Sequence, residues 1–217
     1  MCTHNDLIDE VVIKPTCTST GLSQKRCVLC DEVIEETVVN KLTHKYGQWV
    51  VLTNSSPIKD GLRFRNCVYC NNLEEQVFKF NKKGSNFVYI ESANINAKFV
   101  IGPFSQFAVD NNDVVYNIER IDCKNPIILG HNTGSLKYLY KTKVGTTIYV
   151  YLNNVLTIYT VVSSEPAVTI PKDIEGLNTG RRLCSYFDTD CLRLYTCYKD
   201  VNLGEIRWLV IAEKFGN

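Results

Sequence analysis

The sequence predicts an all-β protein, and three observations support that fold class. Runs rich in Val, Ile, Thr and Tyr recur along the 217 residues, and these residue types favour strands over helices. Two such runs, residues 147–152 and 155–159, flank Asn153-Asn154 in the pattern of a β-hairpin. No segment has the long 3.6-residue periodicity of an amphipathic helix. With 45% hydrophobic residues, the chain can form a packed core.

The first 80 residues contain an internal repeat whose copies match without a gap. Cys27-Val28-x-Cys30 in the first copy matches Cys67-Val68-x-Cys70 in the second, and Thr3-His4 matches Thr43-His44. Each copy is expected to form short strands around its Cys-x-x-Cys turn. Strands are predicted at residues 33–39 and 49–53, and a turn at 59–61. We therefore expect residues 1–80 to be a duplicated Cys-x-x-Cys repeat module.

The Cys-x-x-Cys turns and histidines of this module indicate a zinc site. The zinc would be structural, because small units with little apolar core need a metal ion or a covalent cross-link for stability. One candidate ligand set lies within the first repeat and consists of His4, Cys17, Cys27 and Cys30. The second repeat has Pro57 where the first has Cys17, so it would lack one ligand. The alternative is a shared four-thiolate site of Cys27, Cys30, Cys67 and Cys70. We favour the first set because a duplicated unit is expected to carry its own site; disulfides or free thiols are the remaining alternative.

A polar stretch at residues 79–86 is expected to link this module to a second domain, residues 81–217. Within that domain, Trp208–Ala212 is a continuous apolar run, which is typical of a strand buried on both faces.

Three residues of the second domain could together carry out thiol acyl transfer. His131 is its one histidine, Cys197 ends a segment of alternating apolar residues, and Arg207 interrupts an apolar run. In such chemistry the cysteine is the nucleophile, the histidine carries protons and the arginine stabilises the developing oxyanion. A neighbouring cation also favours the thiolate. The structural alternatives are a turn histidine, an inert buried thiol, and an arginine that forms a salt bridge with Glu205 or Glu213.

These residues lie in segments that resemble the sortases, cysteine transpeptidases of Gram-positive cell surfaces. The resemblance consists of Leu-x-Thr-Cys at 194–197, Gly-His-Asn at 130–132 and the strand arginine, Arg207. It extends to the barrel strands at residues 86–90, 125–132, 145–151 and 158–162, with a short helical stretch near 135–140, and covers roughly residues 86–217. Together with the number of strands, the resemblance implies a closed sortase-like barrel of about eight strands.

The resemblance also implies a two-step mechanism. The Cys197 thiolate would attack the carbonyl between Thr and Gly of a Leu-Pro-x-Thr-Gly-like sorting signal, while Arg207 stabilises the oxyanion and His131 protonates the leaving amine. His131 would then deprotonate an acceptor amine from a peptidoglycan cross-bridge or a pilin lysine, which attaches the protein to the cell surface or to a pilus. Thr196 is expected to shape the groove that binds the signal. This chemistry needs no metal or organic cofactor.

Two other functions remain open for this domain. One is a non-catalytic module that binds a peptide on a sortase-like barrel, and the other is a thiol hydrolase in which water resolves the same intermediate. Some sortases use calcium, but residues 110–113 fit a turn better than a calcium site. The other cysteines of the domain are expected to be structural; they are Cys123, Cys184 and Cys191.

The charge and hydropathy of the chain bear on partners and location. The net charge is +1, from 24 basic and 23 acidic residues, so no charge pattern indicates binding to nucleic acid or to an anionic membrane. No apolar run is long enough to span a bilayer, and the first residues lack the apolar core of a signal peptide. The resemblance implies a membrane-anchored enzyme at the extracellular face. The chain is then either a piece of a longer anchored protein or a soluble variant, and we favour the first because the function of the family needs a surface location.

Overall fold

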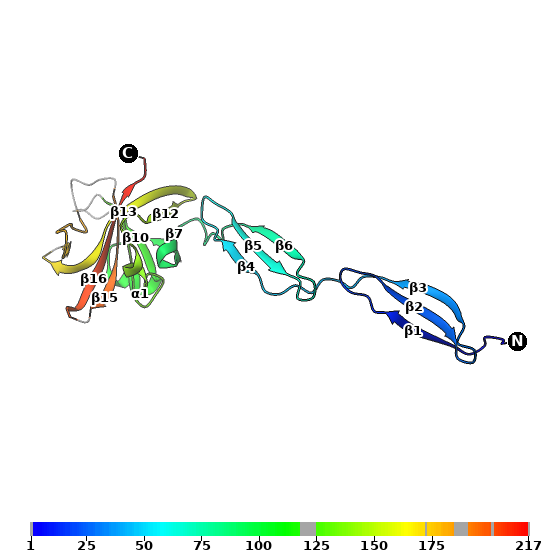
Figure 1. Ribbon diagram of the computed structural model, residues 1–217. Helices are drawn as coiled ribbons and strands as arrows, with labels where there is room; N and C mark the ends of the chain where they lie inside the picture. The colour runs from blue at the N-terminus through cyan, green and yellow to red at the C-terminus, as the bar shows by residue number, and fades with distance from the viewer. Residues whose placement is uncertain (1, 118–124, 172, 185–190, 201, 217) are drawn as a thin grey trace. The chain divides into compact units, whose positions relative to one another are not determined.

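The computed structural model describes residues 2–117, 125–171, 173–184, 191–200 and 202–216 (Figure 1). By their contacts these residues divide into two compact units, Met1–Phe80 and Asn81–Asn217. Both units are built mainly from β-sheets. No helix in the described ranges is long and apolar enough to cross a membrane.

The first unit contains two three-stranded antiparallel sheets of the same order (Figure 1). The strands of the first sheet are β1 (Leu7–Ile13), β2 (Gly21–Cys27) and β3 (Val33–Val39), and those of the second are β4 (Val50–Thr53), β5 (Gly61–Asn66) and β6 (Leu73–Phe78). The central strand of each sheet runs into the Cys-x-x-Cys turn. Each turn ends with a left-handed residue, Asp31 (φ 62°) or Asn71 (φ 57°), residue types that tolerate this conformation. The strand predicted at 33–39 is confirmed, and that predicted at 49–53 begins one residue later.

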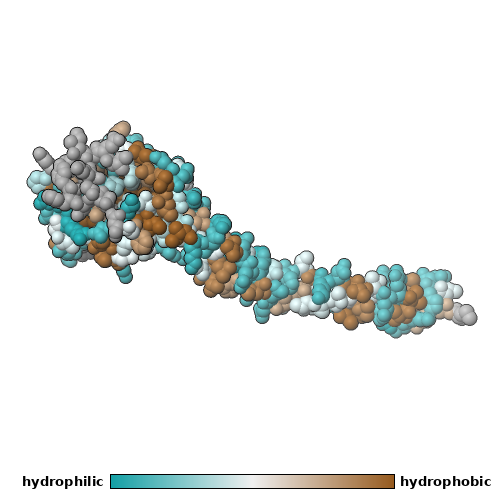
Figure 2. Space-filling view, turned by 90° about the horizontal axis from the view of Figure 1, so that it is seen from above, coloured by the Kyte–Doolittle hydropathy of each residue, from teal (hydrophilic) through white to brown (hydrophobic). Residues whose placement is uncertain are grey.

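These two sheets have very little core. Every residue of β1 is exposed, and Figure 2 shows brown apolar side chains beside teal polar ones on the surface of this unit. Within its described residues, the buried apolar side chains are those of Cys17, Cys27 and Cys67. So small an apolar core contributes little to the stability of this unit.

The second unit contains one large sheet that curls back on itself. Its strands are β7 (Phe87–Ile90), β8 (Ile95–Lys98), β9 (Val100–Ile101), β10 (Val114–Asn117), β11 (Ile127–Gly130), β12 (Thr147–Leu152), β13 (Val155–Ile170), β14 (Asp173–Gly176), β15 (Cys191–Asp200) and β16 (Gly204–Lys214). The strand order is β8-β7-β12-β13-β16-β15-β11-β10-β9, with β14 beside β13. Since only Phe99 separates the two edge strands, β8 and β9, in the chain, the sheet nearly closes. The prediction of a mostly β, barrel-like fold is confirmed, with nine strands along the described path rather than about eight.

Both faces of the central strands are covered. One face carries the barrel core, which includes Leu194 and Val210. The other face carries a second apolar cluster, in which Leu209 packs with Ala108 of the short helix α1 (Gln106–Asn112) and with Ile174 of β14. The predicted burial of the 208–212 strand on both faces is confirmed for residues 209–212, whereas Trp208 is half-buried.

The local predictions for the second unit had different outcomes. The predicted hairpin is formed by β12 and β13, which pair from Leu152 to Val155 around Asn153 (φ 51°) and Asn154 (φ 66°). Two adjacent positive φ angles are what a type I′ turn requires. The helical stretch predicted near 135–140 is a 3-10 turn, Leu139–Lys141. The turn predicted at 110–113 is wrong, because residues 110–112 end helix α1 and only Asp113 (φ 55°) leaves it.

Candidate functional site

Cys197 and Arg207 lie directly opposite each other on the antiparallel strands β15 and β16. Opposite residues of an antiparallel pair point to the same face, with their Cβ atoms roughly 5 Å apart. Both side chains are half-buried, so each is accessible from solvent. Arg207 Nη1 donates a hydrogen bond to the carbonyl of Ile206, 3.2 Å away. A thiol and a guanidinium therefore share one face of the sheet at a partly open position.

His131 joins this pair through the neighbouring strand β11. Strand β11 is parallel to β15, and its last residue, Gly130, pairs with Thr196. His131 directly follows Gly130 and Cys197 directly follows Thr196, so the two residues lie beside each other. The three residues His131, Cys197 and Arg207, here called the thiol row, lie side by side at the end of β11, on β15 and on β16.

Thr196 holds two strands of this row together. Its side chain is 2% exposed, and its hydroxyl donates a 2.8 Å hydrogen bond to the carbonyl of Gly130. This position differs from the groove-lining role expected from the sequence. The contact fixes β11 against β15 at the level of the thiol row.

The His131 ring is held by a carboxylate that the sequence did not reveal. His131 Nε2 lies 2.8 Å from Oδ1 of Asp110, on helix α1. A carboxylate bound to one ring nitrogen fixes the orientation and tautomer of the imidazole. Helix α1 is capped at its start by Ser105, whose side chain accepts a hydrogen bond from the N–H of Ala108. The spacing of Asp110 and His131 matches no short motif, so it gave no signal in the sequence.

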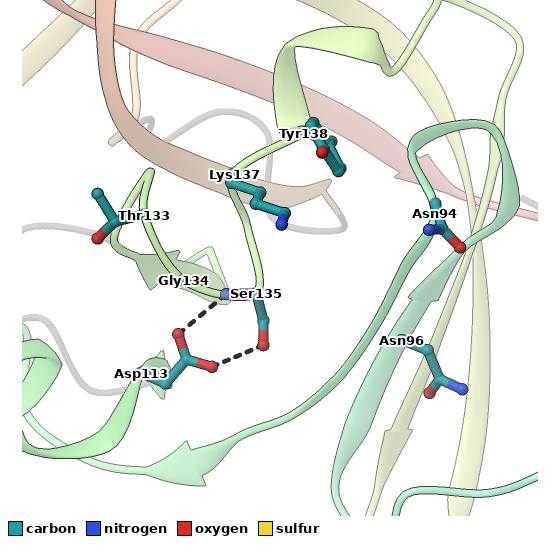
Figure 3. Close-up of a pocket in the computed structure, with 8 residues that line it drawn as sticks. All are labelled: Asn94, Asn96, Asp113, Thr133, Gly134, Ser135, Lys137 and Tyr138. Atoms are coloured by element: carbon teal, nitrogen blue, oxygen red, sulfur yellow. Dashed lines mark hydrogen bonds between the residues drawn. The ribbon is translucent and has the colours of Figure 1, made fainter.

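The turn after His131 borders a polar pocket of about 640 Å³ (Figure 3). Asp113 organises this turn, because its carboxylate accepts hydrogen bonds from the N–H (3.0 Å) and the hydroxyl (2.6 Å) of Ser135. A Cβ at residue 134 would collide with that carboxylate, so a larger residue there would have to displace Asp113 from Ser135. The Gly-His-Asn-Thr-Gly segment is thus shaped by a local contact rather than by the sheet alone.

A second cavity, of about 280 Å³, lies beside the thiol row on the face that carries Arg207. Its walls are mainly apolar and aromatic, and they include one carboxylate. They consist of Phe104, Thr169, Ile170, Asp173, Ile174, Tyr195 and Arg207. An apolar hollow with a few polar groups is the usual character of a site that binds a small side chain or ligand. Among the cysteines expected to be structural, Cys191 is buried and Cys123 lies outside the described residues.

The first unit contains two groups of four metal-ligating side chains. Cluster 1 consists of Cys2, His4, Cys27 and Cys30, and cluster 2 of Cys17, His44, Cys67 and Cys70. In each cluster the ligand atoms all lie within 4.8 Å of one another. Each cluster could hold a metal ion.

The distances within the clusters fit tetrahedral coordination. The Sγ atoms of Cys2 and Cys27 are 3.5 Å apart, and those of Cys17 and Cys67 are 3.9 Å apart. Ideal tetrahedral zinc would separate two thiolates by about 3.8 Å, whereas a disulfide needs about 2.0 Å. The two thiol–imidazole separations, 3.5 Å in cluster 1 and 3.3 Å in cluster 2, are close to the ideal value of about 3.6 Å.

The structure groups these ligands differently from either predicted set. Cys17 lies with the second repeat and supplies the ligand that Pro57 cannot, so the second repeat is not one ligand short. Cys2, which entered neither predicted set, completes the first cluster. The shared four-thiolate site does not form, because Cys27 and Cys67 belong to different clusters. The reason is the path of the loop after β1, which directs Cys17 away from its own repeat.

The first cysteine of each Cys-x-x-Cys turn has a lowered pKa, which favours its thiolate form. Backbone N–H groups of Cys30 and Leu29 lower the pKa of the Cys27 thiol to about 6. At Cys67 burial opposes ionisation, yet the N–H groups of Tyr69 and Cys70 and the His44 ring lower the pKa of the thiol to about 6. Thiolates are the form in which cysteine binds metal.

Comparisons with known proteins give a distant structural resemblance. No protein-family model matches the chain, and no curated protein sequence matches it. Among solved structures, sortase C1 of the GBS pilus island 1 has a TM-score of 0.44 at 16% identity, covering 61% of this chain and 65% of that one. Sortase C-1 from Streptococcus pneumoniae has a TM-score of 0.44 at 16% identity, covering 61% and 67%. The sortase D5 transpeptidase of Clostridium perfringens has a TM-score of 0.45 at 18% identity, covering 61% and 79%. The chain thus spans about two thirds of the first two structures.

Proposed function

We propose that the second unit is a sortase-like cysteine transpeptidase. The observation that carries the proposal is the thiol row, in which a histidine directly after β11 lies beside a half-buried cysteine on β15 and an arginine on β16. Its substrates would be a Leu-Pro-x-Thr-Gly-like sorting signal and an amine acceptor, such as a peptidoglycan cross-bridge or a pilin lysine. The reaction would attach proteins to the cell surface or to pili, at the extracellular face of the membrane.

Each residue of the row has a chemical task in this reaction. The Cys197 thiolate attacks the Thr carbonyl of the signal, and Arg207 on the same face donates N–H groups to the oxyanion that forms. His131 gives its proton to the leaving amine, which leaves a thioester on Cys197. An acceptor amine then attacks this thioester and loses a proton to His131, and collapse of the tetrahedral intermediate forms the new amide and expels the Cys197 thiolate. Arginine suits its task because it stays cationic and donates from several positions.

The cavity beside the row supports peptide binding at this face. It opens where Arg207 and Tyr195 lie on adjacent strands, and its apolar walls fit an aliphatic side chain of a signal peptide. The backbone of a peptide bound there would pass over the thiol row. Binding remote from the reacting bond would then position the Thr–Gly peptide bond at Cys197.

The test is to incubate the full chain with a panel of Leu-Pro-x-Thr-Gly-like peptides, with and without glycine or lysine amines, and to determine product masses. A transpeptidase gives the ligated product only when the amine is present. Cleaved peptide alone, at the same rate with and without amine, would support the hydrolase instead. Neither product with any peptide would favour a non-catalytic peptide-binding module.

Arg207→Lys is expected to lower kcat/KM for ligation by roughly 10²–10³-fold, the usual effect of losing an oxyanion donor. Lysine keeps the charge but lacks the forked N–H donors of arginine. Steady-state ligation kinetics measure the change. Arg182→Lys is the matched control, because Arg182 is exposed and forms its ion pair with Glu175. Ligation by Arg207→Lys at the rate of this control would contradict the role of Arg207.

Asp110→Asn is expected to lower kcat by about 10-fold with little change in KM, because the ring of His131 loses the anion that orients it. The measurement is the separate determination of kcat and KM. Asp110→Glu should restore most of kcat, and Asn111→Ala, on the same helix, should leave kcat unchanged. A rise in KM with unchanged kcat would assign Asp110 to substrate binding instead.

In the first unit, we propose that clusters 1 and 2 each hold a structural Zn²⁺. Three thiolates and one imidazole at tetrahedral separations form a closed ligand set, which leaves no open position for catalysis. The scarcity of buried apolar side chains in this unit gives the ion a structural task. Elemental analysis of the purified protein should find two zinc ions per chain, and none after treatment with a strong chelator.

A further inference from the structure

We propose that the ion in cluster 2 is a clamp that holds the two repeats of the first unit together, whereas the ion in cluster 1 stabilises the first repeat alone. This inference rests on the proposed zinc occupancy of the clusters. It concerns a different property, the coupling of the two repeats.

The origin of the ligands distinguishes the clusters. In cluster 1 all four ligands, from Cys2 to Cys30, belong to the first repeat. In cluster 2, Cys17 comes from the loop between β1 and β2 of the first sheet, whereas Cys67 and Cys70 come from the turn after β5 of the second sheet. The fourth ligand, His44, lies in the segment that joins the two sheets. One ion would therefore bind three separate segments.

Cys17 is not a ligand of the cluster in its own repeat. The first repeat has four ligands without it, and the second repeat has Pro57 at the corresponding position. Yet Cys17 is 8% exposed, and its Sγ lies 3.9 Å from that of Cys67, which is fully buried. Burial of a thiol against the neighbouring repeat, in a unit with few buried side chains, is what an inter-repeat ligand requires.

Apart from the cluster, one backbone hydrogen bond fixes the start of the joining segment, and the remaining contacts gather at its end, where Tyr46 and Gly47 bind the second repeat. At its start, the N–H of Leu42 donates to the carbonyl of Thr16, 2.9 Å away. Towards its end, the carbonyl of Lys45 accepts from the N–H of Val68, also at 2.9 Å. The ligands Cys17 and His44 are adjacent in the chain to these contacts. Loss of the ion would leave residues 43 and 44 between these two hydrogen bonds without the ligand bond of His44, so the backbone there would open more readily.

Two exposed lysines, Lys41 and Lys45, make this segment a reporter of the clamp. Trypsin cleaves a folded chain where the backbone opens locally, and the cleavage rate follows the open population. Cleavage after Lys41 or Lys45 separates the two repeats and is identified by fragment mass. Cleavage after Lys25, within β2, reports instead on the integrity of the first sheet.

The experiment is limited trypsin proteolysis of the zinc-loaded full chain, comparing wild type, Cys17→Ser and Cys2→Ser. Cys17→Ser is expected to raise cleavage after Lys41 and Lys45 by at least about 10-fold while Lys25 stays protected. Cys2→Ser, which alters cluster 1 only, is expected to expose Lys25 and to leave cleavage after Lys41 and Lys45 at the wild-type rate. Cys17→His, which restores a zinc ligand, should recover protection; it also tests the clamp if the serine variant does not fold.

The outcomes separate the clamp from the zinc on which it rests. Two zinc ions in the wild type, with equal cleavage after Lys41 and Lys45 in wild type and Cys17→Ser, would overturn the clamp and leave structural zinc standing. No zinc in the purified wild type, and no protection on adding it, would overturn both. The ligation assay of the second unit is independent of either result.

Discussion

Cys197→Ala is expected to abolish thioacyl-enzyme formation and to lower ligation by roughly 10⁴-fold or more, the scale of loss when a covalent nucleophile is removed. The barrel should remain folded, because Cys197 is half-buried and its strand is held by the ladders with β11 and β16. Ligation rate with a responsive peptide and far-ultraviolet circular dichroism measure the two effects.

Cys191→Ala is the matched control for this variant. Cys191 lies on the same strand and the same face, but it is buried in the second apolar cluster, which also contains Leu209. Its replacement should cost about 1 kcal/mol of stability and leave ligation unchanged. Ligation by Cys197→Ala at a rate near that of Cys191→Ala would assign the nucleophile elsewhere and leave Cys197 as a structural thiol.

Removal of metal is expected to unfold residues 1–80 while the barrel stays intact. A structural zinc site contributes about 10–16 kcal/mol at neutral pH, which is comparable to the whole stability of a small domain. The repeat sheets have few buried apolar side chains to replace that contribution. Hydrogen exchange followed by mass spectrometry, with and without a strong chelator, should show loss of protection in β1 to β6 only.

The barrel strands serve as the internal control of that measurement. Strand β16 is buried on both faces at residues 209–212 and lies in the other unit, so its exchange should not change. Unchanged protection of β2 and β5 in the metal-free protein would contradict structural zinc. Loss of protection throughout the chain would instead indicate that the two units depend on each other.

Features specified by neighbouring residues were predictable from the sequence. The β12–β13 hairpin follows from two asparagines that tolerate positive φ between β-forming runs. The equal strand order of the two small sheets follows from the repeat, since identical turns close both Cys-x-x-Cys segments. The apolar run at residues 208–212 predicted strand β16, because a strand that is buried on both faces carries apolar residues at consecutive positions.

Features that depend on a loop path or on long-range pairing were not predictable. Cys17 joins the cluster of the second repeat and Cys2 completes that of the first, because a ligand belongs to the cluster that its loop reaches. The row of His131 and Cys197 depends on a parallel pairing between segments that are 66 residues apart at Gly130 and Thr196. Asp110 was assigned to a turn because a helix as short as α1 leaves little periodicity in the sequence.

The central claim is that Cys197 forms a thioester with a sorting signal, and the most direct measurement is the intact mass of the protein mixed with the peptide panel and no acceptor amine. The account predicts an added mass equal to the signal fragment up to its Thr, located on Cys197 by fragmentation and lost on adding an amine. The account would be contradicted if the wild-type protein gained no mass with any peptide although it was folded and iodoacetamide alkylated its Cys197.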